Sequence, residues 1–254
     1  MRLIVLIVIC LGLVSCNKLG LSSGEQVPRL VMFIGADISG SFLKSKNFED
    51  SLDFTAHYLH AHLNGLGGLE KPHALFVGSI GGDKPNEPKT LFPIETFENE
   101  TVDGIRKKLA KIFPKTKSNP FTDYNAFFRQ IASTVKARKL VLKPISVVMI
   151  SDGKPDVPGT RGEKGFRSID LKPLELLSRS VTVRLLYTDA VVGMGWQTKV
   201  PRQRVKVWTQ DAAVMKGWKD PKTFRRGLAF SKQERFFDWV LNNVDFNVRA
   251  QSVN

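Results

Sequence analysis

Cysteine is nearly absent from this chain: its 254 residues include two, Cys10 and Cys16, both close to the N-terminus. No internal disulfide framework is therefore available, and stability must come from a packed core. Acidic residues are also few, since 24 Asp and Glu stand against 38 Lys and Arg and give a formal net charge of +14. That excess favours anionic partners such as phosphate-rich polymers, lipid headgroups or acidic proteins. Internal repeats and low-complexity segments are missing as well, and a hydrophobic content of 42% predicts a folded domain.

Long apolar runs are lacking too, and Leu3 to Leu13 is too short for a permanent membrane span. This run ends in Leu13-Val14-Ser15-Cys16, which resembles a bacterial lipobox, whose cysteine is acylated and becomes the mature N-terminus. The resemblance implies a signal peptide at 1–15, a lipidated tether at 16–28 and anchoring in the cell envelope. Asn17 favours the outer over the inner membrane. The alternative is a plain secretory signal in which Cys16 lies near the cleavage point by chance.

Residues 29–254 are expected to form one α/β domain with a basic C-terminal extension. Strands alternate with helices, which predicts a doubly wound, mostly parallel six-stranded sheet flanked by helices. Pro93 cannot donate to a sheet ladder, so the strand within Thr90 to Phe97 should be an edge strand, antiparallel by the family resemblance given below. Further predicted strands are Ala74 to Ile80, Ile145 to Ile150, Val181 to Tyr187 and Arg204 to Trp208. The predicted helices are Asn47 to Leu63, Thr101 to Phe113, Phe121 to about Lys139, Leu171 to Ser178, and one opened by a capping box at Ser231 to Glu234. Residues 154–170 are rich in Gly, Pro and charge and are expected to be a loop.

The stretch from Val31 to Ser41 organises the rest of the chain. An apolar strand ends in a turn that carries Asp37, Ser39 and Ser41. These oxygen-bearing side chains suit a divalent ion that keeps several of its waters, which is the behaviour of Mg²⁺. Asp152 follows the buried strand Ile145 to Ile150. In a doubly wound sheet these two strands are neighbours at the switch point, where ligands bind beyond the carboxyl ends.

Together these residues resemble a von Willebrand factor type A (vWA) domain with a metal-ion-dependent adhesion site (MIDAS). The resemblance is carried by Asp37 to Ser41, by Thr122 after Pro120, and by Ser151-Asp152-Gly153. It implies that Ser39, Ser41 and Thr122 contact the metal directly, while Asp37 and Asp152 act largely through waters. Mg²⁺ is the implied ion, with Mn²⁺ or Ca²⁺ also possible. Thr116 is the other candidate for the threonine, although it starts no helix.

A metal held by neutral hydroxyls is under-compensated in charge and seeks a carboxylate from a partner. The expected function is therefore a lipid-anchored, metal-dependent protein-binding or adhesion module, and not an enzyme. One alternative is a structural envelope or secretion-assembly lipoprotein that binds anionic partners without metal. Another is a Mg²⁺-dependent phosphoesterase, which would need a nucleophile or base beside the metal. The oligomeric state cannot be read from the sequence.

Two further groups of residues have competing interpretations. Between Trp196 and Arg226 basic residues alternate with tryptophans, and Lys199, Arg202, Arg204 and Lys206 are candidates for binding an anionic partner. Such a pattern can bind nucleic acid, but an exported protein is not expected to meet it, and the tryptophans fit a sheet edge with core side chains. The histidines His57, His60 and His62 could form a metal or pH site, although a helix face is the favoured interpretation because no Cys or carboxylate completes the set.

Overall fold

The computed structural model describes residues 27–116, 118–159 and 162–246. Its sheet has six strands in the order β3-β2-β1-β4-β5-β6, and every neighbouring pair is parallel except β2 and β3. The strands are β1 (Val31–Asp37), β2 (Ala74–Ile80), β3 (Leu91–Pro93), β4 (Ile145–Ile150), β5 (Val181–Thr188) and β6 (Lys206–Asp211). The expected doubly wound sheet is confirmed, and so is the antiparallel edge strand at Pro93.

Strands β1 and β4 lie side by side at the centre of the sheet. Every residue of both strands is buried, which explains why their sequences are continuous apolar runs. Their register pairs Val31 with Ile145 and Ala36 with Ile150, so the two strands end together. Asp37 is the last residue of β1 and Ser151 is the first residue after β4, and the turns that follow both strands meet at one edge of the sheet.

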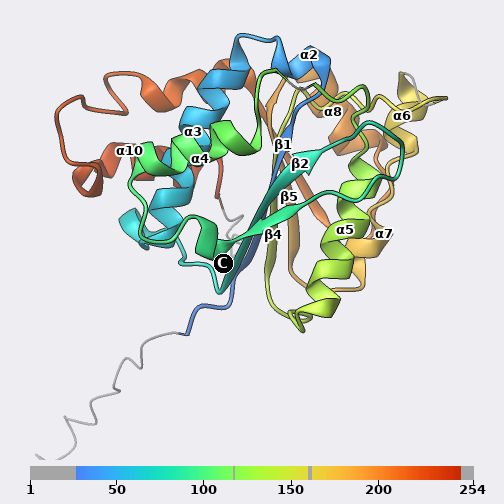
Figure 1. Cartoon of the computed structure of the whole chain (residues 1–254), viewed down its shortest axis with the longest axis horizontal. Helices are drawn as coiled ribbons and strands as arrows, with labels where there is room; N and C mark the ends of the chain where they lie inside the picture. The colour runs from blue at the N-terminus through green and yellow to red at the C-terminus, as the bar shows by residue number, and fades with distance from the viewer. Residues whose placement is uncertain (1–26, 117, 160–161, 247–254) are drawn as a thin grey trace, which may run out of the picture.

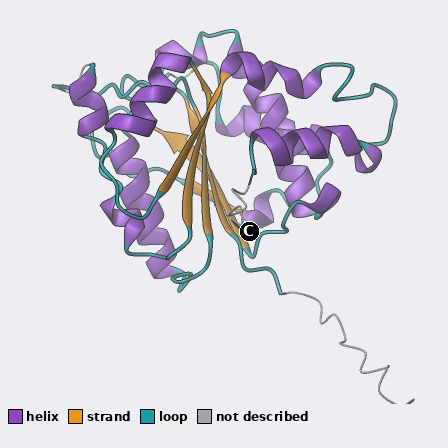
Figure 2. Cartoon of the chain, turned by 180° about the vertical axis from the view of Figure 1, so that it is seen from behind, coloured by secondary structure: helices purple, strands orange, loops and turns teal. Residues whose placement is uncertain are grey.

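Helices cover both faces of the sheet, which is seen edge-on between two helical layers (Figure 1, Figure 2). One core cluster packs α3, α4 and α10 against one face, and a second packs α5, α7 and α8 against the other. The helices are α2 (Gly40–Leu43), α3 (Asn47–Leu63), α4 (Val102–Ile112), α5 (Tyr124–Ala137), α6 (Glu163–Arg167), α7 (Lys172–Glu175), α8 (Ala190–Lys199), α9 (Ala212–Met215) and α10 (Glu234–Asn243). Short 3₁₀ turns lie at Leu66–Gly68 (η1), Ile94–Thr96 (η2), Lys216–Lys219 (η3) and Phe230–Lys232 (η4).

Two local expectations are corrected. The stretch 154–170 is not loop throughout, because α6 forms within it and packs against α8, which the sequence pattern did not indicate. The capping box is wrong, because α10 begins at Glu234 with Gln233 as its N-cap residue and has no side-chain cap. The Gln233 amide instead bonds to the backbone of Arg225, accepting from its N–H (3.0 Å) and donating to its carbonyl (2.6 Å). A long-range contact therefore replaces the expected local one.

Within the described ranges, no helix has both the length and the apolar character needed to cross a bilayer. The predicted signal peptide 1–15, Cys16 and most of the tether lie outside the described residues. The predictions for the N-terminus therefore stay predictions.

Candidate metal site at the carboxyl ends of β1 and β4

Asp37 is the last residue of β1 and is completely buried. Its Oδ1 accepts a hydrogen bond from the backbone N–H of Ser39 at 2.8 Å, which folds the chain into an Asx turn. The short helix α2 starts directly after Ser39, at the end of the sheet where the turns gather (Figure 1). Ser39 is 5% exposed and Ser41 lies open to solvent, and their hydroxyl oxygens are 3.3 Å apart. The turn thus presents two hydroxyls side by side above a buried carboxylate.

Ser151, the first residue after β4, joins the two turns. Its hydroxyl donates to Asp37 Oδ2 at 2.6 Å and accepts the N–H of Gly153 at 3.0 Å. Because its one proton goes to Asp37, the hydroxyl of Tyr124, 2.7 Å away, must be the donor to Ser151. A hydrogen-bond chain therefore runs from Tyr124 on α5 through Ser151 to Asp37 and fixes the carboxylate from behind.

Asp152 is half-buried next to this chain, and its Oδ1 accepts the N–H of Lys154 at 3.1 Å. Gly153 follows with a φ of 82°, a left-handed conformation that glycine adopts without strain. The indole N–H of the buried Trp196 donates to the Gly153 carbonyl at 2.8 Å, and the Trp196 ring packs edge-on against Tyr124. Helix α8 therefore positions the turn that carries Asp152.

Thr122 lies in a loop that crosses the ends of several strands. The Asn119 N–H bonds to the carbonyl of Ile38 at 2.9 Å, and Thr122 exchanges backbone hydrogen bonds with Asp156. The same loop passes so close to Gly81 that a Cβ there would lie 1.9 Å from the Phe121 carbonyl oxygen. These backbone contacts hold the 2% exposed Thr122 over the carboxyl edge. Thr116, the other candidate, is exposed.

The sequence predicts that Thr122 opens the helix, but the helix begins two residues later. Asp123 is the N-cap of α5, and its Oδ1 accepts the N–H of Ala126 at 2.9 Å. Thr122 is therefore part of the crossing loop, and Asp123 caps the helix.

The electrostatics of the site centre on Asp37. Complete burial, with a smaller contribution from the nearby charge of Asp152, raises the pKa of this carboxyl from 3.8 to about 6, against the hydrogen bonds that stabilise the ion. The donors that reach Asp37 are neutral: a backbone N–H and a hydroxyl. A positive charge between Asp37 and Asp152 would stabilise both carboxylates.

The donor set fits a small divalent cation. Neighbouring ligands of an octahedral Mg²⁺ at about 2.1 Å lie roughly 3 Å apart, close to the 3.3 Å between the Ser39 and Ser41 hydroxyls. Both oxygens of Asp37 already accept hydrogen bonds within the chain, which suits a carboxylate acting through water. Among the described residues no group of three or more His, Cys, Asp or Glu could hold a metal. The predicted metal site is of a different kind, because it consists of two carboxylates and three hydroxyls.

The basic residues of the C-terminal region are divided between internal and exposed positions. Lys199 pairs with Glu163 at 3.0 Å, and the Arg202 guanidinium donates to carbonyls at the end of α8, including that of Gln197 at 2.6 Å. Arg204 and Lys206 are exposed. Two of the four candidates for anion binding thus have internal partners.

The tryptophans of this region belong mainly to the cores. Trp196 is fully buried and Trp218 is 4% exposed, while Trp208 packs against Phe246 with ring centroids 4.9 Å apart. The expectation of core tryptophans therefore holds for Trp196 and Trp218, although they lie in α8 and η3, whereas Trp208 lies in the edge strand β6.

The three histidines of α3 do not converge on one site. His57 packs among aromatic rings, including that of Trp218, and its Nδ1 lies 2.8 Å from the Asp53 carbonyl. His60 Nδ1 lies 3.0 Å from the Glu100 carbonyl, whereas His62 is bonded to Asp245. The helix-face interpretation is therefore the better one for His57 and His60.

Three residues support the site in roles that were not predicted: Ser151 as a bridge, Tyr124 as its donor and Trp196 as the anchor of Gly153. Ser151 already belongs to the predicted motif, and its bridging role could have been inferred because it precedes Asp152 at the end of a buried strand. No signal in the sequence indicates that Tyr124 and Trp196 reach the same turns, since the three segments are far apart along the chain.

Comparisons with known proteins give matches at the level of structure alone. No protein-family model matches the chain, and no curated protein matches it. A structure of proximal thread matrix protein 1 from the mussel byssus has 12% sequence identity and a TM-score of 0.45, covering 84% of this chain and 47% of the mussel protein. A second structure of that protein, with a zinc-occupied MIDAS motif, has 14% identity and a TM-score of 0.42 over 75% and 45% of the two chains.

The VWA domain of SpRpn10 matches with 14% identity and a TM-score of 0.43, over 72% of this chain and 88% of that domain. This chain spans about half the length of the mussel protein. At these identities and TM-scores the matches carry no argument about ligands or partners. The strand order of the chain itself shows a doubly wound sheet with one antiparallel edge strand, the architecture expected from the vWA resemblance.

Proposed function

We propose that this chain is a metal-dependent protein-binding module that captures a carboxylate of a partner protein. The observation that carries the proposal is the meeting of two turns, Asp37 to Ser41 and Ser151 to Gly153, through the bond from Ser151 to Asp37. Two carboxylates and two adjacent hydroxyls lie at that junction, beyond the carboxyl ends of the two central strands. This is the edge at which doubly wound sheets bind ligands.

The vWA resemblance assigns a role to each residue of the set. Ser39, Ser41 and Thr122 would contact the ion, and Asp37 and Asp152 would hold its waters. A bound Mg²⁺, or Mn²⁺ or Ca²⁺ in its place, supplies positive charge and an open coordination position. Because Ser41 is exposed, that position is accessible from solvent. Because neutral hydroxyls do not compensate the charge of the metal ion, a carboxylate of a partner protein can then bind to it and supply the missing negative charge.

Binding is preferred to catalysis because, among the described residues, no histidine lies at the two turns. The four histidines of the chain lie elsewhere, three on α3 and His73 at the amino end of β2. Ser39 has the Ser41 hydroxyl and the Asp37 carboxylate as neighbours, and both oxygens of that carboxylate already accept hydrogen bonds, from the Ser39 N–H and the Ser151 hydroxyl. A phosphoesterase would need a nucleophile or base that is free to act beside the metal.

The N-terminal residues add a location to this proposal. A lipid on Cys16 and the tether to residue 28 would hold the module at a bacterial envelope membrane, with the outer membrane favoured by Asn17. A structural, metal-free role through a basic surface is the second candidate, and it is supported by the exposure of Arg204 and Lys206.

Titration calorimetry of the full chain with Mg²⁺ and Mn²⁺ tests the metal. The native chain should bind, Ser39→Ala should weaken binding by at least about tenfold, and Ser45→Ala should not change it. Ser45 is the matched control because it lies in the next turn of chain, where its hydroxyl accepts a hydrogen bond from the Asn47 N–H at 3.3 Å. If the native chain binds neither ion, the metal-dependent function is wrong.

Capture of envelope proteins with and without EDTA then tests the partner. Proteins that are retained by the native chain should be released by EDTA and should not be retained by Ser39→Ala. Retention that is unchanged by the chelator and instead lost on Arg204→Glu with Lys206→Glu would favour the structural, metal-free role.

A further inference from the structure

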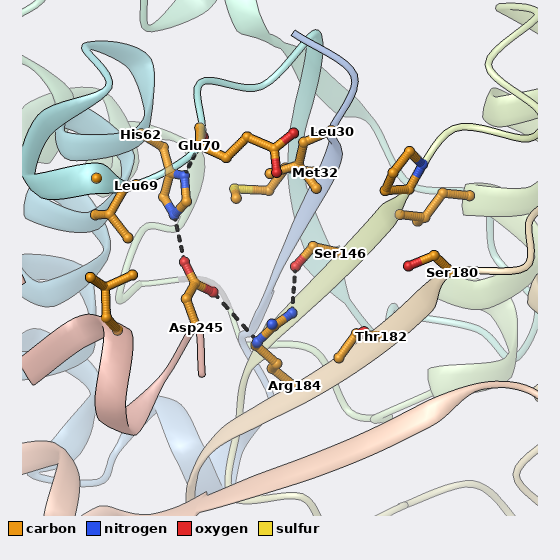
Figure 3. A pocket seen from close by; sticks show the side chains of 14 residues that line it. Leu30, Met32, His62, Leu69, Glu70, Ser146, Ser180, Thr182, Arg184 and Asp245 are labelled. Atoms are coloured by element: carbon orange, nitrogen blue, oxygen red, sulfur yellow. Dashed lines mark hydrogen bonds and ion pairs between the residues drawn. The ribbon is translucent and has the colours of Figure 1, made fainter. Parts of the chain in front are cut away.

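A cavity lies at the amino ends of the strands, opposite the candidate metal site. It has a volume of about 350 Å³ and opens at the amino ends of β1, β4 and β5, beneath the C-terminal ends of α3 and α10 (Figure 3). Clefts of this size hold small molecules in other proteins. The carboxyl-edge turns described above contribute none of its lining residues, so this cavity is separate from the candidate metal site.

His62 forms one charged wall of the cavity. Its Nδ1 lies 2.8 Å from the Glu70 carbonyl oxygen, and its Nε2 lies 2.8 Å from Asp245 Oδ2. Both partners are acceptors, so the ring can bond to both only as an imidazolium, in which each nitrogen donates. The side chain is 2% exposed, and the geometry therefore holds a positive charge in the interior.

Arg184 on β5 supplies a second cation, and its side chain is 9% exposed. Its Nε donates to the Val244 carbonyl at 2.7 Å, and its Nη1 donates to the Ser146 hydroxyl at 2.9 Å. A guanidinium has five N–H groups. Within the described ranges, the other three N–H groups have no acceptor. A buried, planar donor group thus lines the cavity with bonding capacity left over.

Among the described residues, Asp245 is the single carboxylate that pairs with these two cations. It lies between His62 and Arg184 (Figure 3), and its Oδ1 also accepts the hydroxyl of Tyr58 at 2.8 Å. The cluster is therefore one positive charge in excess. Glu70 does not neutralise it, because that side chain is exposed at the mouth and its contact with His62 is through the backbone.

The rest of the lining is apolar with two hydroxyls at the rim. Leu30, Met32 and Leu241 form the apolar part, Thr182 lies beside Arg184, and Ser180 lies farther from it (Figure 3). We propose that this cavity binds a small monocarboxylate, whose carboxylate pairs with the free N–H groups of Arg184 while its apolar tail lies against the leucines and Met32. A carboxylate matches a guanidinium by two parallel hydrogen bonds, and its charge balances the excess cation.

Hexanoate is the probe, and hexanol and inorganic phosphate are its controls. Calorimetry with the full chain should show hexanoate binding at least about tenfold more tightly than hexanol, which has the tail without the charge. It should also bind more tightly than phosphate, which has the charge without the tail. Equal binding of hexanoate and hexanol, or preferential binding of phosphate, would overturn the proposal.

Variants place the binding in this cavity. Arg184→Lys keeps the charge but removes the planar N–H pair, and should weaken hexanoate binding by at least about tenfold. Thr182→Val removes a rim hydroxyl at nearly constant volume and should weaken it by about two- to fivefold. Glu70→Gln should strengthen it slightly by removing a like charge at the mouth.

Asp83→Asn, beyond the other edge of the sheet, is the matched control and should have no effect. If Arg184→Lys does not fold, the Thr182→Val and Glu70→Gln pair decides, and two unchanged affinities would contradict the proposal. Mg²⁺ binding should be the same with and without hexanoate, so this result is read independently of the metal site.

Discussion

Two aspartates at opposite edges of the sheet make an instructive comparison. Asp37 at the carboxyl edge is completely buried and is reached by neutral donors, a backbone N–H and the Ser151 hydroxyl. Asp245 at the amino edge is 12% exposed and is reached by His62 and Arg184, both cationic, and by the Tyr58 hydroxyl. Burial acts to raise the pKa of both carboxylates, but the groups around Asp37 are neutral and two of those around Asp245 are cationic.

The pKa values move in opposite directions as a result. Burial raises the pKa of Asp37 to about 6, whereas at Asp245 the attraction of His62 and Arg184 outweighs burial and lowers the pKa. The comparison separates two uses of a buried acid. Asp245 is stabilised within the chain and joins the C-terminal segment to α3 and β5, while Asp37 is left short of positive charge, as a cation-binding residue would be.

Replacing Asp245 by Asn should give the largest effect. The substitution leaves His62 and Arg184 facing each other without their shared anion, and breaking such a pair costs about 3 to 5 kcal/mol. The free energy of unfolding, measured by urea denaturation at neutral pH, should fall by about that amount. Asp238→Asn on the exposed face of α10 is the control and should change it by less than about 0.5 kcal/mol. If the free energy of unfolding falls no more than in the control, Asp245 does not stabilise this cluster.

The two aspartates also differ in how far the sequence reveals them. Asp37, Ser39 and Ser41 lie within five residues, so the turn that unites them can be predicted from local pattern alone. His62 and Asp245 are separated by 183 positions, and their contact depends on how α10 docks on α3. The sequence shows that α10 must dock because of its aromatic residues, but it does not show which polar groups will meet.

The same distinction explains the rest of the fold. Strands β1 and β4 are predictable because a strand that is buried on both faces needs a continuous run of apolar residues. Helix α8 is not, because Val192 and Trp196 are buried together with Gly193 and Gly195, and this mixture gives no clear amphipathic stripe. Gly195 is required by packing, since a Cβ there would lie 2.7 Å from the Phe166 ring. That is a tertiary cause which local pattern cannot show.

Replacing Asp37 by Asn should raise stability in the presence of chelator. Because the folded-state pKa of about 6 lies above the ordinary 3.8, the folded chain binds the proton more tightly than the unfolded chain. Stability from this group is therefore present below about pH 4 and is lost as the pH rises through about 6. At neutral pH the loss is about 3 kcal/mol for about two pKa units, and the neutral amide should avoid it.

Urea denaturation in EDTA at neutral pH and near pH 4 measures this effect. Asp37→Asn should exceed the native chain at the higher pH and match it at the lower one, and Mg²⁺ should stabilise only the native chain. The opposite sign of pH dependence is expected for Asp245, whose lowered pKa contributes stability that is lost as the pH falls below its ordinary value. A native chain that is as stable as Asp37→Asn at both pH values would contradict the contrast between the two edges.

Tyr124→Phe should give the smallest effect, and it tests whether the neutral donors around Asp37 act as a unit. The Tyr124 hydroxyl donates to Ser151, which in turn donates to Asp37, and donors in such a chain polarise one another. Without the tyrosine hydroxyl the bond from Ser151 should weaken, and the pKa of Asp37 should rise further. Proton competition with the metal would then begin at higher pH, so the midpoint of the pH dependence of Mn²⁺ binding should move upward by less than about one unit.

Tyr187→Phe removes a buried hydroxyl bonded to Asp50 at 3.0 Å instead, and should leave that midpoint unchanged. Equal midpoints for the native chain and Tyr124→Phe would mean that Ser151 alone sets the hydrogen bonding of Asp37, and that α5 contributes packing without polarising the site.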